Sequence, residues 1–139
     1  MIGGLARSIY SWWSASSLPA TFTGGLWHQE AKHGAPFPYV VFDIIGSTSS
    51  SWTSDSEIRR QAVQFSIYWK ENGTSDPAIA VGELQDSLDA AIKSATFNIT
   101  GGGEVFSLRR TRDDIRKDPH TSQVWKGELD YRILRRENE

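Results

Sequence analysis

The chain has 139 residues, no cysteine and a formal net charge of −2. This length fits one compact domain that can bury a core without covalent staples. The absence of cysteine excludes disulfides, thiol nucleophiles and cysteine-ligated metal sites, and the small net charge gives the whole molecule no electrostatic preference for nucleic acid or for an anionic membrane. No apolar run approaches the roughly 18 residues that a membrane-spanning helix needs, so we expect no membrane partner.

The first part of the chain predicts one helix and one buried strand. Apolar residues at helical spacing predict a helix from about residue 4 to residue 17, and they are Leu5, Ile9, Trp12 and Trp13. We expect this helix to end before Pro19. Leu26 to Gln29 favours a short strand, and residues 39–45, which read YVVFDII, predict a central strand because their apolar character is nearly continuous.

A serine- and threonine-rich stretch follows, from Gly46 to Glu57. Apart from Trp52 it offers almost nothing to bury, so we expect a projecting hairpin loop at about residues 46–57. A large aromatic side chain in such a loop either folds back onto the sheet or anchors a partner, as aromatic residues do in interfaces.

The middle of the chain predicts a half-buried strand and a second helix. Apolar residues alternate from Val63 to Trp69 within a strand from Ile58 to Lys70, as a sheet with one dry face requires. Asp76 followed by Pro77 is a typical helix start, and we expect this helix to continue to about residue 95. Its apolar face is formed by Val81, Leu84, Leu88, Ala91, Ile92 and Ala95.

The C-terminal part predicts two long strands, at residues 104–116 and 123–134, preceded by a short strand at 97–100. The last strand again alternates, with Leu129 and Tyr131 on one face and Glu128 and Asp130 on the other. We expect residues 135–139 to be frayed. The order of elements predicts an α+β fold in a single domain, residues 1–139: a two-layer sandwich of a mainly antiparallel sheet with two helices on one face.

Clusters of chemically reactive residues give no catalytic, cofactor or metal assignment. His28, Glu30 and His33 lie within six residues, but their spacing matches no established zinc motif, and surface polar residues are the alternative. The glycines at 101–103 are followed by neither Lys-Ser nor Lys-Thr and precede a strand, so they are no phosphate loop. We therefore expect a protein that is not an enzyme and that has neither a cofactor nor a bound metal.

The densest charge lies in residues 109–118, which read RRTRDDIRKD. A solvated strand edge, ion pairing between subunits and phosphate contact all fit such a run, since arginine pairs bidentately with carboxylates and with phosphates. A metal-dependent nuclease site using Asp113, Asp114 and Asp118 is a further alternative. The signs of the charges are mixed, which disfavours the last two interpretations.

Several segments, taken in order, resemble the tail terminator family of long-tailed phages, also described as tail completion or tail-to-head joining proteins. They are an N-terminal helix, PFPYVVFDII entering a strand, RRQAVQFSIYW after a polar loop, a helix around AVGELQDSLDAAI, the strand VFSLRRTRDDIRKD and the closing VWKGELDYRI. The resemblance covers residues from about 5 to 134 and is one of pattern rather than of a single motif.

The resemblance implies a structural virion protein without catalysis. Members of the family form a hexameric ring at the head-proximal end of the tail, which stops tail-tube polymerisation and joins the tail to the head. The implied partners are copies of the chain itself, the tail tube protein and a head-completion or neck protein, with assembly in the host cytoplasm; the only nucleic acid is DNA passing through the lumen of the ring.

The resemblance also suggests where contacts lie. For the tube or another partner they are Trp52, Ser50, Ser51, Thr53 and Asp55; for neighbouring subunits or the lumen they are Arg109, Arg110, Arg112, Asp113, Asp114 and Arg116. Three alternatives remain open: another neck component such as a head-closure protein, a small nucleic-acid-binding domain that uses the Arg109–Arg116 strand, and a monomeric ligand-binding domain with an apolar pocket.

Overall fold

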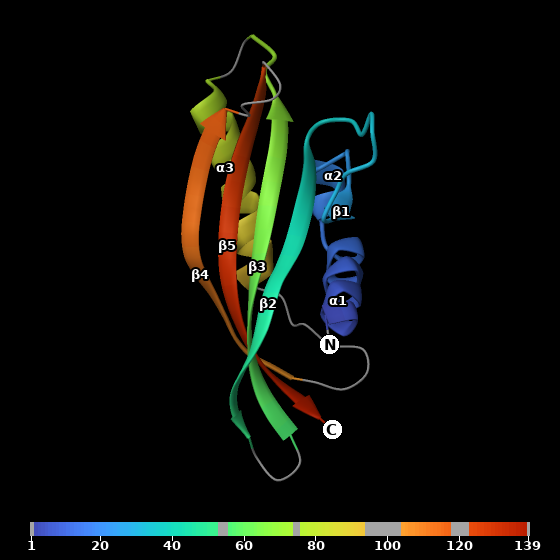
Figure 1. Cartoon of the computed structure of the whole chain (residues 1–139). Helices are drawn as coiled ribbons and strands as arrows, with labels where there is room; N and C mark the ends of the chain where they lie inside the picture. The colour runs from blue at the N-terminus through green and yellow to red at the C-terminus, as the bar shows by residue number, and fades with distance from the viewer. Residues whose placement is uncertain (1, 53–55, 74–75, 94–103, 118–122, 139) are drawn as a thin grey trace.

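The computed structural model describes residues 2–52, 56–73, 76–93, 104–117 and 123–138 (Figure 1). They form three helices and five strands. The elements are α1 (Ile2–Ala15), α2 (Leu18–Thr21), β1 (Leu26–His28), β2 (Tyr39–Trp52), β3 (Ser56–Lys70), α3 (Pro77–Lys93), β4 (Glu104–Lys117) and β5 (Val124–Asn138).

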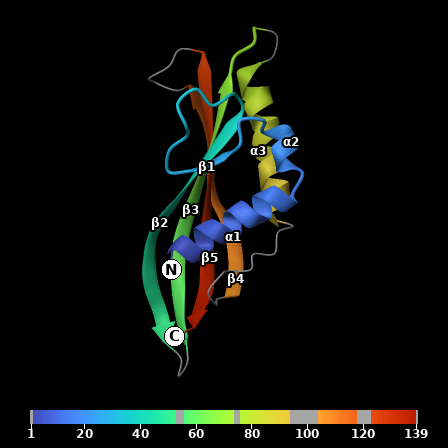
Figure 2. The ribbon, with the colours of Figure 1, turned by 90° about the vertical axis from the view of Figure 1, so that its right-hand side faces the viewer.

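The strands form one sheet in the order β1-β2-β3-β5-β4. The short β1 runs parallel to β2, and every other pairing is antiparallel. The helices lie on one side of this sheet, which Figure 2 shows nearly edge-on. The predicted α+β class is therefore confirmed. α2 was not predicted from the sequence; it is a four-residue helix in which Pro19 lies in the first turn, a position that proline tolerates.

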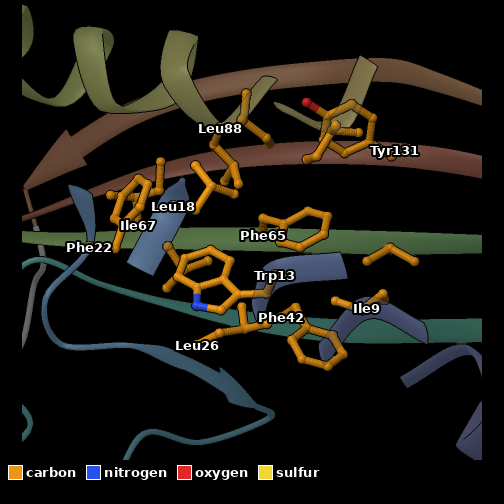
Figure 3. Packing of buried hydrophobic residues seen from close by; sticks show 14 of the residues in the cluster. Ile9, Trp13, Leu18, Phe22, Leu26, Phe42, Phe65, Ile67, Leu88 and Tyr131 are labelled. Carbon is orange, nitrogen blue, oxygen red and sulfur yellow. The ribbon is translucent and has the colours of Figure 1, made fainter. Parts of the chain in front are cut away.

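The core lies between the sheet and the helices (Figure 3). Phe42 of β2 pairs with Phe65 of β3, which pairs with Leu129 of β5, so their side chains form one row on the helix-covered face. The opposing layer comes from the helices and from Phe22, which directly follows α2; the helical residues are Ile9, Trp13, Leu18, Leu88 and Ile92. All nine residues are at most 5 % exposed. The alternation predicted for β3 and β5 is thus confirmed for the described side chains.

α3 begins and packs as its sequence predicts. The Asp76 carboxylate accepts a hydrogen bond of 2.9 Å from the Ala78 amide, which satisfies one of the donors left free at a helix N-terminus. The helix lies close to β5 at Gly127, where an added Cβ would stand 2.6 Å from Val81 Cγ1. Glycine at this position therefore sets how closely the helix approaches the sheet.

Two local predictions are wrong. Residues 46–57 are mostly strand rather than loop, because β2 continues to Trp52 and β3 begins at Ser56; Thr53 and Asp55 lie outside the described residues. Main-chain pairing with β3 sustains this strand without apolar side chains. Residues 135–138, predicted to be frayed, form the end of β5, which pairs with both β3 and β4. The predicted strand at 97–100 lies outside the described residues.

Candidate functional site

The face of the sheet opposite the helices carries the most organised polar groups of the described structure. It is formed by the residues of β2, β3, β4 and β5 that alternate with the core residues, and we call it the open face. Tyr39 pairs with Tyr68 and Tyr68 with Lys126, while Ser66 pairs with Glu128, so these side chains share one face. None of the three described helices lies over it (Figure 1).

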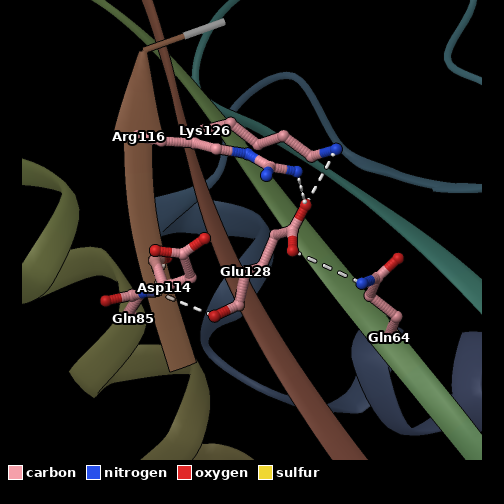
Figure 4. A network of polar contacts seen from close by, with 6 residues as sticks. All are labelled: Gln64, Gln85, Asp114, Arg116, Lys126 and Glu128. Atoms are coloured by element: carbon pink, nitrogen blue, oxygen red, sulfur yellow. Dashed lines mark hydrogen bonds and ion pairs between the residues drawn. The ribbon is translucent and has the colours of Figure 1, made fainter. Parts of the chain in front are cut away.

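Glu128 is the centre of a charged network on this face (Figure 4). Its carboxylate Oε1 accepts a hydrogen bond of 2.8 Å from Arg116 Nη2 and lies 3.0 Å from Lys126 Nζ. The other oxygen, Oε2, accepts a longer bond of 3.4 Å from Gln64 Nε2. Glu128 is only 3 % exposed, so these partners replace the water that a buried carboxylate would lose.

Lys126 links this network to a row of aromatic rings. Its ammonium lies 5.7 Å from the centre of the Tyr68 ring, which stacks on Tyr39 at 5.0 Å, and Tyr39 contacts Phe37 at 5.2 Å. Partial burial of Lys126 disfavours its charged form, but the hydrogen bond to Glu128 and the interaction with Tyr68 outweigh it and raise the pKa of the ammonium. Lys126 therefore remains a cation held between a carboxylate and a ring.

Gln85 of α3 fixes the backbone beneath this network. Its Nε2 donates to the carbonyl oxygens of Asp114 and Glu128, at 2.8 and 3.1 Å. The side chain reaches both strands across Gly127, where no Cβ stands in its way. The open face is thus tied to the helical layer through the backbones of β4 and β5.

The cluster His28, Glu30 and His33 does not assemble into a metal site. Among the residues that the structure describes, no group of three His, Cys, Asp or Glu side chains could hold a metal ion. The His28 ring instead stacks on Phe42, with 4.6 Å between the ring centres. No described helix is long and apolar enough to cross a membrane.

The charged residues of β4 that were predicted as contacts lie opposite different residues of β5. Asp114 and Arg116 pair with Glu128 and Lys126 and belong to the open face, where Arg116 is engaged by Glu128. The structure describes only the backbone of the others. By register, Arg109 and Arg112 lie opposite Arg132 and Asp130, whereas Arg110 and Asp113 lie opposite the core residues Tyr131 and Leu129.

The predicted partner contacts lie far from this network along β2. Ser50, Ser51 and Trp52 are its last residues, and Thr53 and Asp55 lie outside the described residues. Their role in partner contact stays a prediction.

Neither the row of aromatic rings formed by Phe37, Tyr39 and Tyr68 nor the network around Glu128 was predicted from the sequence. Lys126 and Glu128 alternate with apolar residues in β5, which indicated a polar face. What brings Arg116 and Gln64 to Glu128 is the pairing of β5 with two other strands, which is not visible in local patterns.

Comparison with known proteins agrees with the fold. A chain in the "Virion of native gene transfer agent (GTA) particle" superposes with a TM-score of 0.72 at 15 % identity, over 98 % of this chain and 97 % of that chain. Identity this low shows a shared fold alone. No curated protein matches the chain. The family model of the tail completion protein gp17 matches residues 7–136. The resemblance to tail completion proteins is thus confirmed, and the chain belongs to the tail completion protein gp17 family.

Proposed function

We propose that this chain is a structural protein of a phage tail, which assembles into a ring at the head-proximal end, stops growth of the tail tube and joins the tail to the head. The observation that carries the proposal is the family match over residues 7–136. Membership supports a structural role in the tail. The ring, the end of the tail and the partners are the finer parts of the proposal.

The geometry of the open face suits binding better than turnover. Glu128 is held by two cations and an amide, and Gln85 holds the backbone beneath it. Tyr39, Tyr68 and Arg116 are of the residue types that dominate protein interfaces. A rigid surface of this kind offers a partner a fixed shape at little entropic cost. We infer that the chain binds other proteins and catalyses no reaction.

The partners that we propose are copies of the same chain, the tail tube protein and a head-completion protein, with DNA passing through the lumen. The β4 residues Arg109, Arg110, Arg112, Asp113, Asp114 and Arg116 remain the candidates for contact with a neighbouring subunit or the lumen. Trp52, Ser50, Ser51, Thr53 and Asp55 remain the candidates for contact with the tube.

A nucleic-acid-binding role has weaker support. Arg116, the one arginine of the β4 run whose side chain is described, is bound to Glu128, and Asp114 shares its face. Phosphate binding would require such arginines to release their carboxylate partners. A head-closure protein, the neighbouring component of the neck, is the alternative within the same structural class.

A capping assay tests the proposal. Tail tube protein is polymerised with and without the purified chain, and the products are examined by electron microscopy. We expect shorter tubes with added density at one end. The double variant Arg110→Glu, Arg112→Glu should weaken capping more than it weakens the folded monomer, whose unfolding midpoint is measured alongside.

Two results would overturn the proposal. Binding to the head-side connector without any effect on tubes would identify a head-closure protein. Affinity for DNA that falls steeply with salt, again without capping, would favour the nucleic-acid-binding alternative.

A further inference from the structure

The sheet has two outer edges, formed by β4 on one side and by β2 with the short β1 on the other. β4 is the last strand on one side, with β5 as its partner strand. On the other side, β1 pairs with β2 only from Val40 to Phe42. Beyond Phe42, β2 continues for ten residues with β3 as its partner strand among the described residues. Within the described parts of the chain, no strand pairs with the outer side of β4 or with the outer side of β2 beyond Phe42.

The far part of β2, residues 46–52, is poorly protected as an edge. It reads GSTSSSW and contains no charged residue and no proline, the residue types with which natural edge strands discourage pairing. It continues past the end of α1 in both views of the chain (Figures 1 and 2). Ile45, directly before it, is 56 % exposed. An unprotected edge beside an exposed apolar side chain is typical of a surface that a partner covers.

The two outer strands also bend at the same level of the sheet. β2 carries irregularities between Ile45 and Thr48 and between Ser49 and Ser51. β4 carries two, between Val105 and Ser107 and between Arg110 and Arg112. Through the strand pairings, these positions align with the segment of β5 from Asp130 to Arg136. β-Bulges increase local twist and bend a strand, so both edges change course where they would meet a neighbour.

We propose that the outer edge of β4 in one copy pairs with residues 46–52 of β2 in the next copy. This inference rests on the proposed ring. β2 and β4 run in opposite directions within one chain, so copies set side by side in the same orientation place them antiparallel. The two edges are different surfaces, which makes the contact heterologous. A heterologous contact gives a ring when its rotation closes, as the proposed ring requires. Strand addition supplies main-chain hydrogen bonds whatever the side chains are.

Cysteine cross-linking tests the pairing, because the chain contains no cysteine of its own. Ser49→Cys is combined, in separate variants, with Val105→Cys, Ser107→Cys or Arg109→Cys, so that the register need not be known. The assembled rings are oxidised and separated under denaturing conditions. We expect at least one combination to convert most of the chain into a ladder reaching the full ring size. The matched control, Asp86→Cys with Ser107→Cys, places one thiol on an exposed position of α3 and should give no ladder.

A second measurement uses the wild-type chain and avoids any effect of substitution on folding. Hydrogen exchange of backbone amides is compared between the ring and the dissociated chain. Exchange in residues 46–52 and in β4 should slow by about tenfold or more in the ring, because pairing protects amides. Rings that form without cross-links and without this protection would overturn the edge pairing and leave the ring intact. A chain that forms no ring, alone or with tubes, would overturn the proposed function and this inference with it.

Discussion

The two faces of the sheet bury residues in different ways. On β5, Leu129 is 0 % exposed because the helices cover it, and the adjacent Glu128 is 3 % exposed because Arg116, Lys126 and Gln64 surround it on the open face. Neighbouring residues of one strand thus serve the core and a charged surface. Low exposure alone does not identify a core residue; the side chains that cause it do.

This difference assigns separate roles to alternate residues. The helix-covered face supplies stability through apolar burial, whose free energy scales with area. The open face contributes less to stability, because ion pairs gain little beyond the water they lose. A slip of one residue in register would exchange the two sets, so the apolar face also fixes where the charged one lies.

The largest predicted effect is on the helix-covered face of β3. Phe65→Ala should lower the free energy of unfolding by about 3–5 kcal/mol, since the ring is buried against Phe42, Trp12 and Tyr131. Gln64→Ala, one residue away on the open face, should cost less than about 1 kcal/mol. Urea titration of both variants measures the difference, and equal losses would contradict the separation of roles.

Leu88→Ala should cost about 2–5 kcal/mol, because this side chain of α3 is completely buried in the core. An exposed residue of the same helix, Asp86, provides the comparison, and Asp86→Ala should change stability by less than about 0.5 kcal/mol. The denaturation midpoints of the two variants measure this difference. An unchanged midpoint for Leu88→Ala would mean that α3 packs on the sheet through a different face.

Two glycines at the helix–sheet contact should respond with opposite sign. Gly127→Ala forces its Cβ against Val81 and Gln85 and should destabilise by about 1–3 kcal/mol. An alanine Cβ at Gly82 would meet only Ile115 Cδ1, at 3.9 Å, so Gly82→Ala should stabilise α3 by up to about 1 kcal/mol. The melting temperatures of the two variants measure this difference. If both substitutions raised the melting temperature, α3 would not lie as close to Gly127 as the structure shows.

On the open face, Glu128→Gln should cost about 1–3 kcal/mol, because Arg116 and Lys126 lose a charged acceptor while the shape of the side chain is kept. Glu83→Gln, at an exposed position of α3, is the control and should be nearly neutral. Chemical denaturation compares them. Similar, small effects would mean that the network adds nothing to stability.

The smallest effect is the dependence of stability on alkaline pH. The pKa of Lys126 is raised in the folded state, so its contribution is fully present below the ordinary value of 10.5 and is lost as the pH rises through the raised value. The stability difference between the wild type and Lys126→Met should therefore shrink above about pH 10.5. A difference that stays constant into that range would contradict the assignment.

Features set by residues close together in the sequence could be predicted, whereas features set by pairing between distant strands could not. The alternation of β3 and the apolar face of α3 are local patterns, and both are confirmed. Residues 46–52 were predicted as loop because their serines bury nothing, whereas the strand is held by main-chain pairing with β3.

The candidate site likewise combines local patterns, which the sequence shows, with contacts between distant strands, which it does not. A charged surface on β4 and a polar face of β5 were visible in the sequence, but Gln64 and Glu128 are 64 positions apart and meet only through strand pairing. Among the charged residues of β4, Asp114 and Arg116 are on the open face. The subunit or lumen contacts proposed for the charged residues of β4 all remain predictions.

The measurement that tests the central claim most directly is the mass of the chain in solution, determined by light scattering over a range of concentrations, alone and with tail tubes. A structural ring protein should form a closed oligomer, expected to be a hexamer, either by itself or once tubes are present. A strict monomer at every concentration, unaffected by tubes, would contradict the proposed function.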